Sequence, residues 1–155
     1  MSKPVNVHGT GLVLGQCGLL LRGPSGTGKS LLCLALLDRW ESRGLPAALV
    51  ADDRVDLVEE PEGLFMAPPP RLSGLIELRG RGIVSRPCRE HARLDLVIDL
   101  VPDLVRLIEP HEFQTELLGH VLARAPVPQS GTVSLGHQEL LVLEALRASG
   151  HHPLP

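Results

Sequence analysis

Aromatic residues are nearly absent from this sequence of 155 residues. There is no tyrosine, and the aromatic side chains are those of Trp40, Phe65 and Phe113. Single-stranded nucleic acid is usually bound on aromatic platforms on which the bases stack, so this scarcity argues against such a surface. The core must therefore be packed with leucine and valine.

Cysteine is also scarce and irregularly spaced. The three residues Cys17, Cys33 and Cys88 form an odd set without a C-x-x-C pair, a pattern that predicts neither a disulfide framework nor a zinc site. No apolar stretch approaches the roughly 18 residues that span a bilayer, and no signal-peptide core is visible. These absences predict a cytoplasmic protein with reduced thiols and no membrane partner.

Charge of one sign is not in large excess. The formal net charge is −3 and the pI is about 6.1, which provides no overall attraction to nucleic acid, and we expect no nucleic-acid partner. Either a solvated surface or a site for phosphate or an acidic partner protein would explain the arginines of mid-chain, which are Arg71, Arg79, Arg81, Arg86, Arg89 and Arg93.

The length and the 43% content of apolar residues suit one α/β domain over residues 1–155. In the first third, residues 5–22 alternate and turn as a hairpin does, and Leu19–Arg22 enters a glycine-rich segment. A helix is predicted over residues 29–43, ended by Gly44. The apolar run 47–51 suits a buried parallel strand reached by a crossover.

The rest of the chain is less regular. Residues 75–78 predict a short strand or a turn, and residues 94–100 predict a strand. In residues 113–127 the apolar positions fit a helix face, but residues 121–127 equally fit a strand, and the pattern leaves both open. A late helix is predicted over residues 135–148, with Leu140, Leu143 and Leu146 among its apolar positions.

The segment 23–30 is a complete G-x-x-x-x-G-K-[ST] phosphate-binding loop between a predicted strand and a predicted helix. In such a loop the glycines turn backbone N–H groups toward phosphate, Lys29 contacts the β- and γ-phosphates, and the Ser30 hydroxyl reaches Mg²⁺. The sequence therefore predicts a nucleoside triphosphate site built from Gly23, Pro24, Ser25, Gly26, Thr27, Gly28, Lys29 and Ser30.

Two carboxylates, Asp52 and Asp53, end the predicted strand 47–51. In phosphoryl transfer, a carboxylate at the end of a strand next to the loop either holds Mg²⁺ or positions and deprotonates the nucleophile. Adjacent residues of a strand point in different directions, so one pair can do both. The alternative is an aspartate pair that merely begins a turn.

Four motifs in order resemble the catalytic domain of HPr kinase/phosphorylase, which phosphorylates a serine of the phosphocarrier protein HPr. They are Val7-His8-Gly9, the loop 23–30, the stretch V-A-D-D-R-V at 50–55, and L-I-E-L-R-G-R-G-I at 75–83. The match is convincing over residues 5–101. Because the chain begins close to this core, we expect the short form of some proteobacteria, which lacks the N-terminal domain of the family.

The resemblance implies a P-loop kinase of the phosphoenolpyruvate-carboxykinase-like type, with a central mixed sheet and flanking helices. It also implies ATP and Mg²⁺ as cofactors and an HPr-like phosphocarrier as partner, and it leaves homo-oligomerisation open. Lys29 would hold phosphates, Ser30, Asp53 and Glu77 would organise Mg²⁺, and Asp52 would accept the serine proton. His8 would lie beside the phosphates and tune that carboxylate.

The segment 84–93 is shorter than the corresponding loop of the family, which leaves reverse phosphorolysis open. Two other functions are also compatible with the loop alone: a nucleotide-binding regulatory module that signals through a protein partner without transferring phosphate, and a small-molecule kinase. The regulatory module needs Lys29 and Ser30 but not Asp52.

Overall fold

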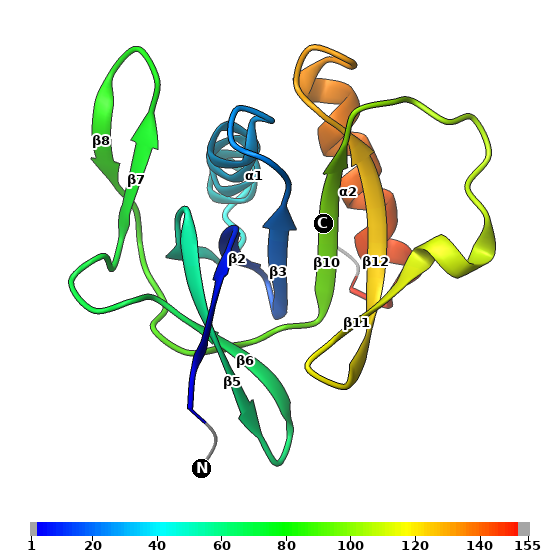
Figure 1. Cartoon of the computed structure of the whole chain (residues 1–155). Coiled ribbons are helices and arrows are strands. Elements are labelled where there is room, and N and C mark those ends of the chain that lie inside the picture. Colours follow the sequence, from blue (N-terminus) through cyan, green and yellow to red (C-terminus); the bar gives the residue numbers. More distant parts are fainter. Residues whose placement is uncertain (1–2, 152–155) are drawn as a thin grey trace.

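The computed structural model describes residues 3–151, and its centre is a mixed sheet of six strands (Figure 1). In the order β11-β12-β10-β3-β2-β4, these strands are Gln114–Leu117, His120–Pro128, Leu96–Val101, Cys17–Arg22, Thr10–Leu14 and Ala47–Ala51. The three middle strands β12, β10 and β3 are parallel, and β11, β2 and β4 each pair antiparallel with their neighbours.

A smaller antiparallel sheet has the order β1-β5-β6-β9. Its strands are Val5–His8, Arg54–Glu60, Gly63–Ala67 and Ala92–Arg93. A separate hairpin, β7 (Leu75–Leu78) and β8 (Gly82–Ser85), projects beside the main body in Figure 1.

Two apolar clusters hold three layers together. Helices α1 (Lys29–Ser42) and α2 (Leu135–Ala148) pack on one face of the central sheet, and the small sheet covers the other face. A short 3-10 helix, η1 (Pro110–Phe113), precedes β11. Alternation along β3 serves both faces, because Leu19 and Leu21 belong to the helix-side cluster and Leu20 to the other.

The fold class predicted from the sequence, an α/β fold with a central mixed sheet and flanking helices, is confirmed. Helix α2 has the predicted bounds, and α1 ends one residue before the predicted end. The predicted hairpin forms between β2 and β3, whereas β1 leaves it and pairs with β5. Residues 75–78 form a strand, and the strand predicted over residues 94–100 is β10.

One detail of the prediction is wrong, and one open alternative is resolved. The run 47–51 is a buried strand that is reached through α1 and runs in the same direction as β3, but its sheet partner is the antiparallel β2, because the β2–β3 hairpin inserts β2 between β3 and β4. For residues 113–127 the sequence left two alternatives open; the strand over 121–127 is confirmed and the helix is wrong. The segment begins at the last residue of η1 and then forms two strands, β11 and β12, joined by a two-residue turn at Leu118 and Gly119, where φ is 49° and 81°.

Among the described residues, no helix has the length and apolar character of a membrane span.

Candidate active site

The glycine-rich loop joins the end of β3 to the start of α1. Gly23, Gly26 and Gly28 have φ values of 156°, 85° and 95°, a region that other residues seldom adopt. Close packing adds to this demand at Gly28, because a Cβ there would lie 2.9 Å from Cβ of Ser130. A hydrogen bond within the loop stabilises this conformation: the Thr27 hydroxyl donates to the Pro24 carbonyl at 2.8 Å.

The first turn of α1 is suited to an anion. Its N-cap is Gly28 in a left-handed conformation, no side chain accepts a hydrogen bond from the free N–H groups, and no acidic residue lies in the first turn. The N–H groups of a helix start are therefore open to an outside acceptor, and the helix dipole favours negative charge there. This arrangement can bind phosphate.

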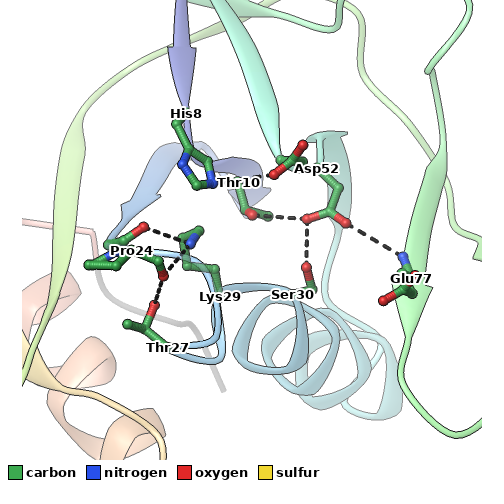
Figure 2. Close-up of polar contacts among 10 residues, drawn as sticks. His8, Thr10, Pro24, Thr27, Lys29, Ser30, Asp52 and Glu77 are labelled. Atoms are coloured by element: carbon green, nitrogen blue, oxygen red, sulfur yellow. Dashed lines mark hydrogen bonds and ion pairs between the residues drawn. The ribbon is translucent and has the colours of Figure 1, made fainter.

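Lys29 is buried against the loop that it follows. Its Nζ donates to the carbonyl oxygens of Gly23 at 2.7 Å and Pro24 at 3.0 Å. Figure 2 shows Lys29 directed toward Pro24. Burial lowers the pKa of Lys29, and the nearby charges of Asp53 and Asp52 oppose that shift. The ammonium group is thus held at a fixed position inside the loop, where a phosphate chain would meet it.

Asp52 connects three elements through its carboxylate (Figure 2). Oδ1 accepts hydrogen bonds from the Ser30 hydroxyl at 2.7 Å and the Thr10 hydroxyl at 3.0 Å. Oδ2 lies 3.5 Å from the backbone N–H of Glu77 on β7. Asp52 therefore lies against the first turn of α1, next to the loop, and its side chain is only partly exposed.

Asp53 faces the solvent side of the same region. Its backbone has a φ of 68°, its side chain is 75% exposed, and Oδ1 lies 3.3 Å from Nε2 of His8, the last residue of β1. The N–H of Gly9 donates to the Asp53 carbonyl at 3.0 Å, which ties the two segments together. Asp53 and His8 thus form a pair that is accessible from solvent.

These residues line one cavity of about 460 Å³. The predicted site residues His8, Ser25, Gly26, Gly28, Lys29, Ser30, Asp52, Asp53 and Glu77 all contribute to its wall. Gly23, Pro24 and Thr27 are not part of the wall, and they act through the contacts to Lys29 and within the loop described above. The structure therefore brings together side chains that are up to 69 positions apart in the sequence.

Sequence reasoning gave no role to four further residues of the wall, Thr10, Leu31, Leu78 and Ser130, and for Arg79 it left open a solvated surface or a site for phosphate or an acidic partner. Thr10 lies between two glycines in the sequence, and nothing in its surroundings indicates that it contacts Asp52. Arg79 lies within a motif that had been recognised, two positions after Glu77. Its place in that motif is the sequence signal that could have identified Arg79 as a residue of the site.

The oxygen donors at this cavity suit a hard cation. Ser30, Asp52 and Glu77 offer a hydroxyl and two carboxylates, which are ligands that Mg²⁺ prefers. In the described part of the chain, no three ligand atoms of His, Cys, Asp or Glu at this cavity lie within 4.8 Å of one another. The donors therefore fit a magnesium ion shared with bound phosphate and water, not a closed protein cage.

Comparisons with known proteins agree with this geometry. The family model described as the HPr Serine kinase C-terminal domain matches residues 1–117. HPr kinase/phosphorylase of Aromatoleum aromaticum is 32% identical over 158 residues, which cover 94% of this chain and 47% of that protein. The enzyme of the same name from a Geobacillus species is 38% identical over 102 residues, 61% of this chain and 31% of the relative.

A solved structure has the same fold. The Hpr(Ser) kinase/phosphatase of Coxiella burnetii superposes with a TM-score of 0.73 at 27% identity and covers 95% of this chain and 94% of that one. The chain spans about half the length, or less, of the curated relatives named above. On the family model, the relatives and this fold, the chain belongs to the HPr serine kinase C-terminal domain family.

Proposed function

We propose that residues 1–155 act as one ATP- and Mg²⁺-dependent serine kinase unit that phosphorylates an HPr-like phosphocarrier protein. The observation that carries this proposal is the shared cavity, in which the glycine-rich loop, a buried lysine and two differently placed aspartates meet. The relatives that are named HPr kinase/phosphorylase support the choice of acceptor. Because ATP is the donor, the proposed place of action is the cytoplasm.

The nucleotide would bind with its phosphates at the loop and the first turn of α1. The loop between β3 and α1, with Lys29 fixed on Gly23 and Pro24, supports the P-loop kinase type that the sequence predicted. The phosphoenolpyruvate-carboxykinase-like variant stays part of the proposal. Its support is the antiparallel pairing of β2 between β3 and β4, which sets this sheet apart from an all-parallel one.

Mg²⁺ would be held by Ser30, Asp52 and Glu77 together with phosphate oxygens. When bound, it would neutralise charge on the phosphates during transfer. The sequence-based assignment put Asp53 on the metal and Asp52 on the seryl hydroxyl. We propose to exchange these two roles, because Asp52 is the carboxylate that contacts the loop serine at 2.7 Å, as the metal-binding aspartate of a phosphate-loop enzyme is expected to do.

Asp53 would then serve the acceptor. A seryl hydroxyl on a folded protein can reach only an accessible base, and the Asp53 side chain is 75% exposed at the cavity wall. As the seryl oxygen bonds to the γ-phosphorus, its proton passes to Asp53, and the bond from the γ-phosphorus to the bridging oxygen of ADP breaks. His8, 3.3 Å away, would orient this carboxylate.

The proposal is tested by incubating the protein with labelled ATP, Mg²⁺ and the HPr-like protein of the same host, followed by mapping of the label. Phosphoserine on the carrier, abolished by Lys29→Ala, is the expected result. Label on a small molecule instead would favour a small-molecule kinase. ATP binding without any transfer would favour the regulatory module, and either outcome would overturn the kinase proposal.

Reverse phosphorolysis is examined with the same reagents. The phosphorylated carrier is supplied with inorganic phosphate and Mg²⁺, and release of pyrophosphate is measured. The family name of the relatives includes a phosphorylase activity, so we propose that the reaction runs in this direction as well. Dephosphorylation without pyrophosphate, or no reaction, would restrict the activity of this chain to the kinase direction.

A further inference from the structure

Three different ligand atoms meet at the end of the central sheet opposite the glycine-rich loop. They are Sγ of Cys17 at the start of β3, a carboxylate oxygen of Asp95 just before β10, and a ring nitrogen of His151 just after α2, and all lie within 4.8 Å of one another. Within residues 3–151, no other three His, Cys, Asp or Glu ligand atoms meet this closely. The length of β3, about 17 Å, separates this group from the start of the loop.

The thiol in this group has a weak partner among residues 3–151. Cys17 is fully buried, and its Sγ donates a hydrogen bond to the Gly18 carbonyl at 3.9 Å. A divalent cation would provide the partner that this thiol needs, because a coordinating cation binds the thiolate and offsets the carboxylate.

The other two ligands are already oriented by neighbours. Oδ2 of Asp95 accepts a hydrogen bond from the Gly18 N–H at 3.0 Å. Nδ1 of His151 lies 3.3 Å from the Ser149 hydroxyl, and the His151 N–H donates to the Leu146 carbonyl at 2.8 Å. Such contacts fix the direction of ligating groups in metal sites.

The position next to the end of α2 also favours a cation. His151 lies three residues after the end of α2, and the C-terminal end of a helix dipole carries partial negative charge. Arg93, whose Nε lies 3.5 Å from Oδ1 of Asp95, has a side chain that is 61% exposed, so it can turn into solvent when a cation arrives.

We propose that Cys17, Asp95 and His151 bind Zn²⁺. One thiolate, one imidazole and one carboxylate form a mixed donor set typical of this borderline-soft ion, and a water molecule would complete the tetrahedron. Binding releases the Cys17 proton to solvent, so that the ion, the thiolate, the carboxylate and a neutral imidazole have no net charge. The bound ion would tie the segment after α2 to the start of β3.

The spacing of the cysteines predicted no zinc site. The proposed site uses a single cysteine, so the spacing between cysteines carries no information about it. Its three ligands lie 78 and 56 positions apart along the chain. Each comes from a different element, so no local motif of the C-x-x-C kind can appear. The site is also independent of the proposed kinase activity, because none of its residues lines the nucleotide cavity.

The test uses Co²⁺ as a spectroscopic probe of the full chain, freed of metal and kept in excess Mg²⁺ without nucleotide. We expect an absorption band of thiolate-to-cobalt charge transfer that Zn²⁺ displaces. The nucleotide cavity has no cysteine in its wall, so it cannot produce this band. Two variants, His151→Gln and Asp95→Asn, should weaken Co²⁺ binding by more than about tenfold.

Matched controls replace residues of the same types elsewhere. Cys88→Ser removes a partly exposed cysteine, and His137→Gln removes a histidine on the first turn of α2. Both should keep the band and its affinity. Zn²⁺ should raise the melting temperature of the parent and of these controls, because an ion that binds the folded protein stabilises it. It should not raise the melting temperature of His151→Gln, because that variant has lost a ligand of the ion.

The proposal is overturned if folded parent protein shows no charge-transfer band, if His151→Gln keeps the parent affinity, or if Cys88→Ser removes the band. Circular dichroism establishes that each variant is folded. His151→Gln is the decisive variant, because His151 lies outside any helix or strand and its replacement leaves both apolar clusters intact.

Discussion

The Ser30 hydroxyl donates a 2.7 Å hydrogen bond to Oδ1 of Asp52, and this bond joins the first turn of α1 to the end of β4. Asp53, the next residue, faces outward and pairs with His8 instead. The two adjacent carboxylates are therefore separated by direction: Asp52 faces the loop, and Asp53 is exposed to solvent. This separation gives the first prediction.

Replacing each aspartate with asparagine should produce different defects. Asp53→Asn removes the proposed base, so we expect transfer to the carrier to fall by about 10²–10⁴-fold while ATP affinity stays within about threefold. Asparagine tolerates the left-handed backbone at this position, where φ is 68°, so strain adds little. Steady-state kinetics and ATP titration measure the two quantities.

Asp52→Asn is the matched variant. Its expected effect is a higher Mg²⁺ requirement, because the proposed metal ligand is weakened and the contact to Ser30 changes. If Asp52→Asn leaves the Mg²⁺ dependence unchanged while Asp53→Asn raises it, the original sequence-based assignment of the two roles is the correct one.

Gly28→Ala should damage both the loop and its ligand binding. The new Cβ would lie 2.9 Å from Cβ of Ser130, and φ of 95° is unfavourable for alanine. We expect a loss of about 2 kcal/mol or more in the free energy of unfolding by urea, and loss of ATP binding.

Gly15→Ala is the control, since φ there is 64° but no atom lies within 4 Å of the new Cβ. It should cost about 1 kcal/mol and keep ATP binding; equal effects of the two changes would show that the Ser130 contact is unimportant.

Asp99 should make stability depend on acid. Burial alone would raise its pKa, but hydrogen bonds from Arg22 at 2.7 Å and Arg124 at 2.6 Å outweigh burial and lower it. A carboxyl with a lowered pKa in the fold stabilises at pH above its unfolded value, about 3.9, and this contribution is lost as the pH falls through the folded value. The free energy of unfolding of the parent, measured with urea, should therefore decrease as the pH falls from the unfolded pKa through the folded one.

Asp99→Asn should be less stable by about 3 kcal/mol at neutral pH, because it leaves Arg22 and Arg124 without their charged partner, and its acid dependence should be flatter. Glu144→Gln is the control. That residue makes a pair with Arg147 within α2, its side chain is 70% exposed, and its loss should change little at any pH. A parent-like acid profile in Asp99→Asn would contradict the assignment.

Helix α2 provides a test of which leucines hold it. Leu143 is 3% exposed and Leu140 is 57% exposed, although the sequence pattern placed both among the apolar positions. Leu143→Ala should cost about 2–5 kcal/mol in urea unfolding, and Leu140→Ala less than about 0.5 kcal/mol. Similar losses would mean that Leu140 is covered in solution, which sedimentation analysis would detect as self-association.

The local features of this protein were predictable from the sequence. The loop 23–30 is one contiguous motif, and helix α2 has a strong period and a capping serine, Ser134, whose side chain accepts a hydrogen bond from the N–H of His137. The two aspartates follow a short apolar strand. Each of these signals lies within about ten residues of the element that it defines.

The predictions that failed concern pairings between distant segments. Nothing near Val5–His8 indicates that it pairs with β5, and nothing in Ala47–Ala51 tells an antiparallel neighbour from a parallel one. The region 113–127 was ambiguous because its apolar spacing fits both periods. The turn at Leu118 and Gly119, with positive φ at both residues, is typical of a two-residue hairpin and decides for strands.

Three sheets contribute to one cavity: Asp52 follows β4 of the central sheet, His8 ends β1 of the small sheet, and Glu77 lies on the β7–β8 hairpin. The loop and α1, in contrast, form from neighbouring residues. Since contacts between distant segments are the slowest to close, we expect a folding chain to acquire the ability to grip polyphosphate before it acquires the ability to react with it. Under the proposed function, the chain would therefore stay catalytically silent until its tertiary structure is complete.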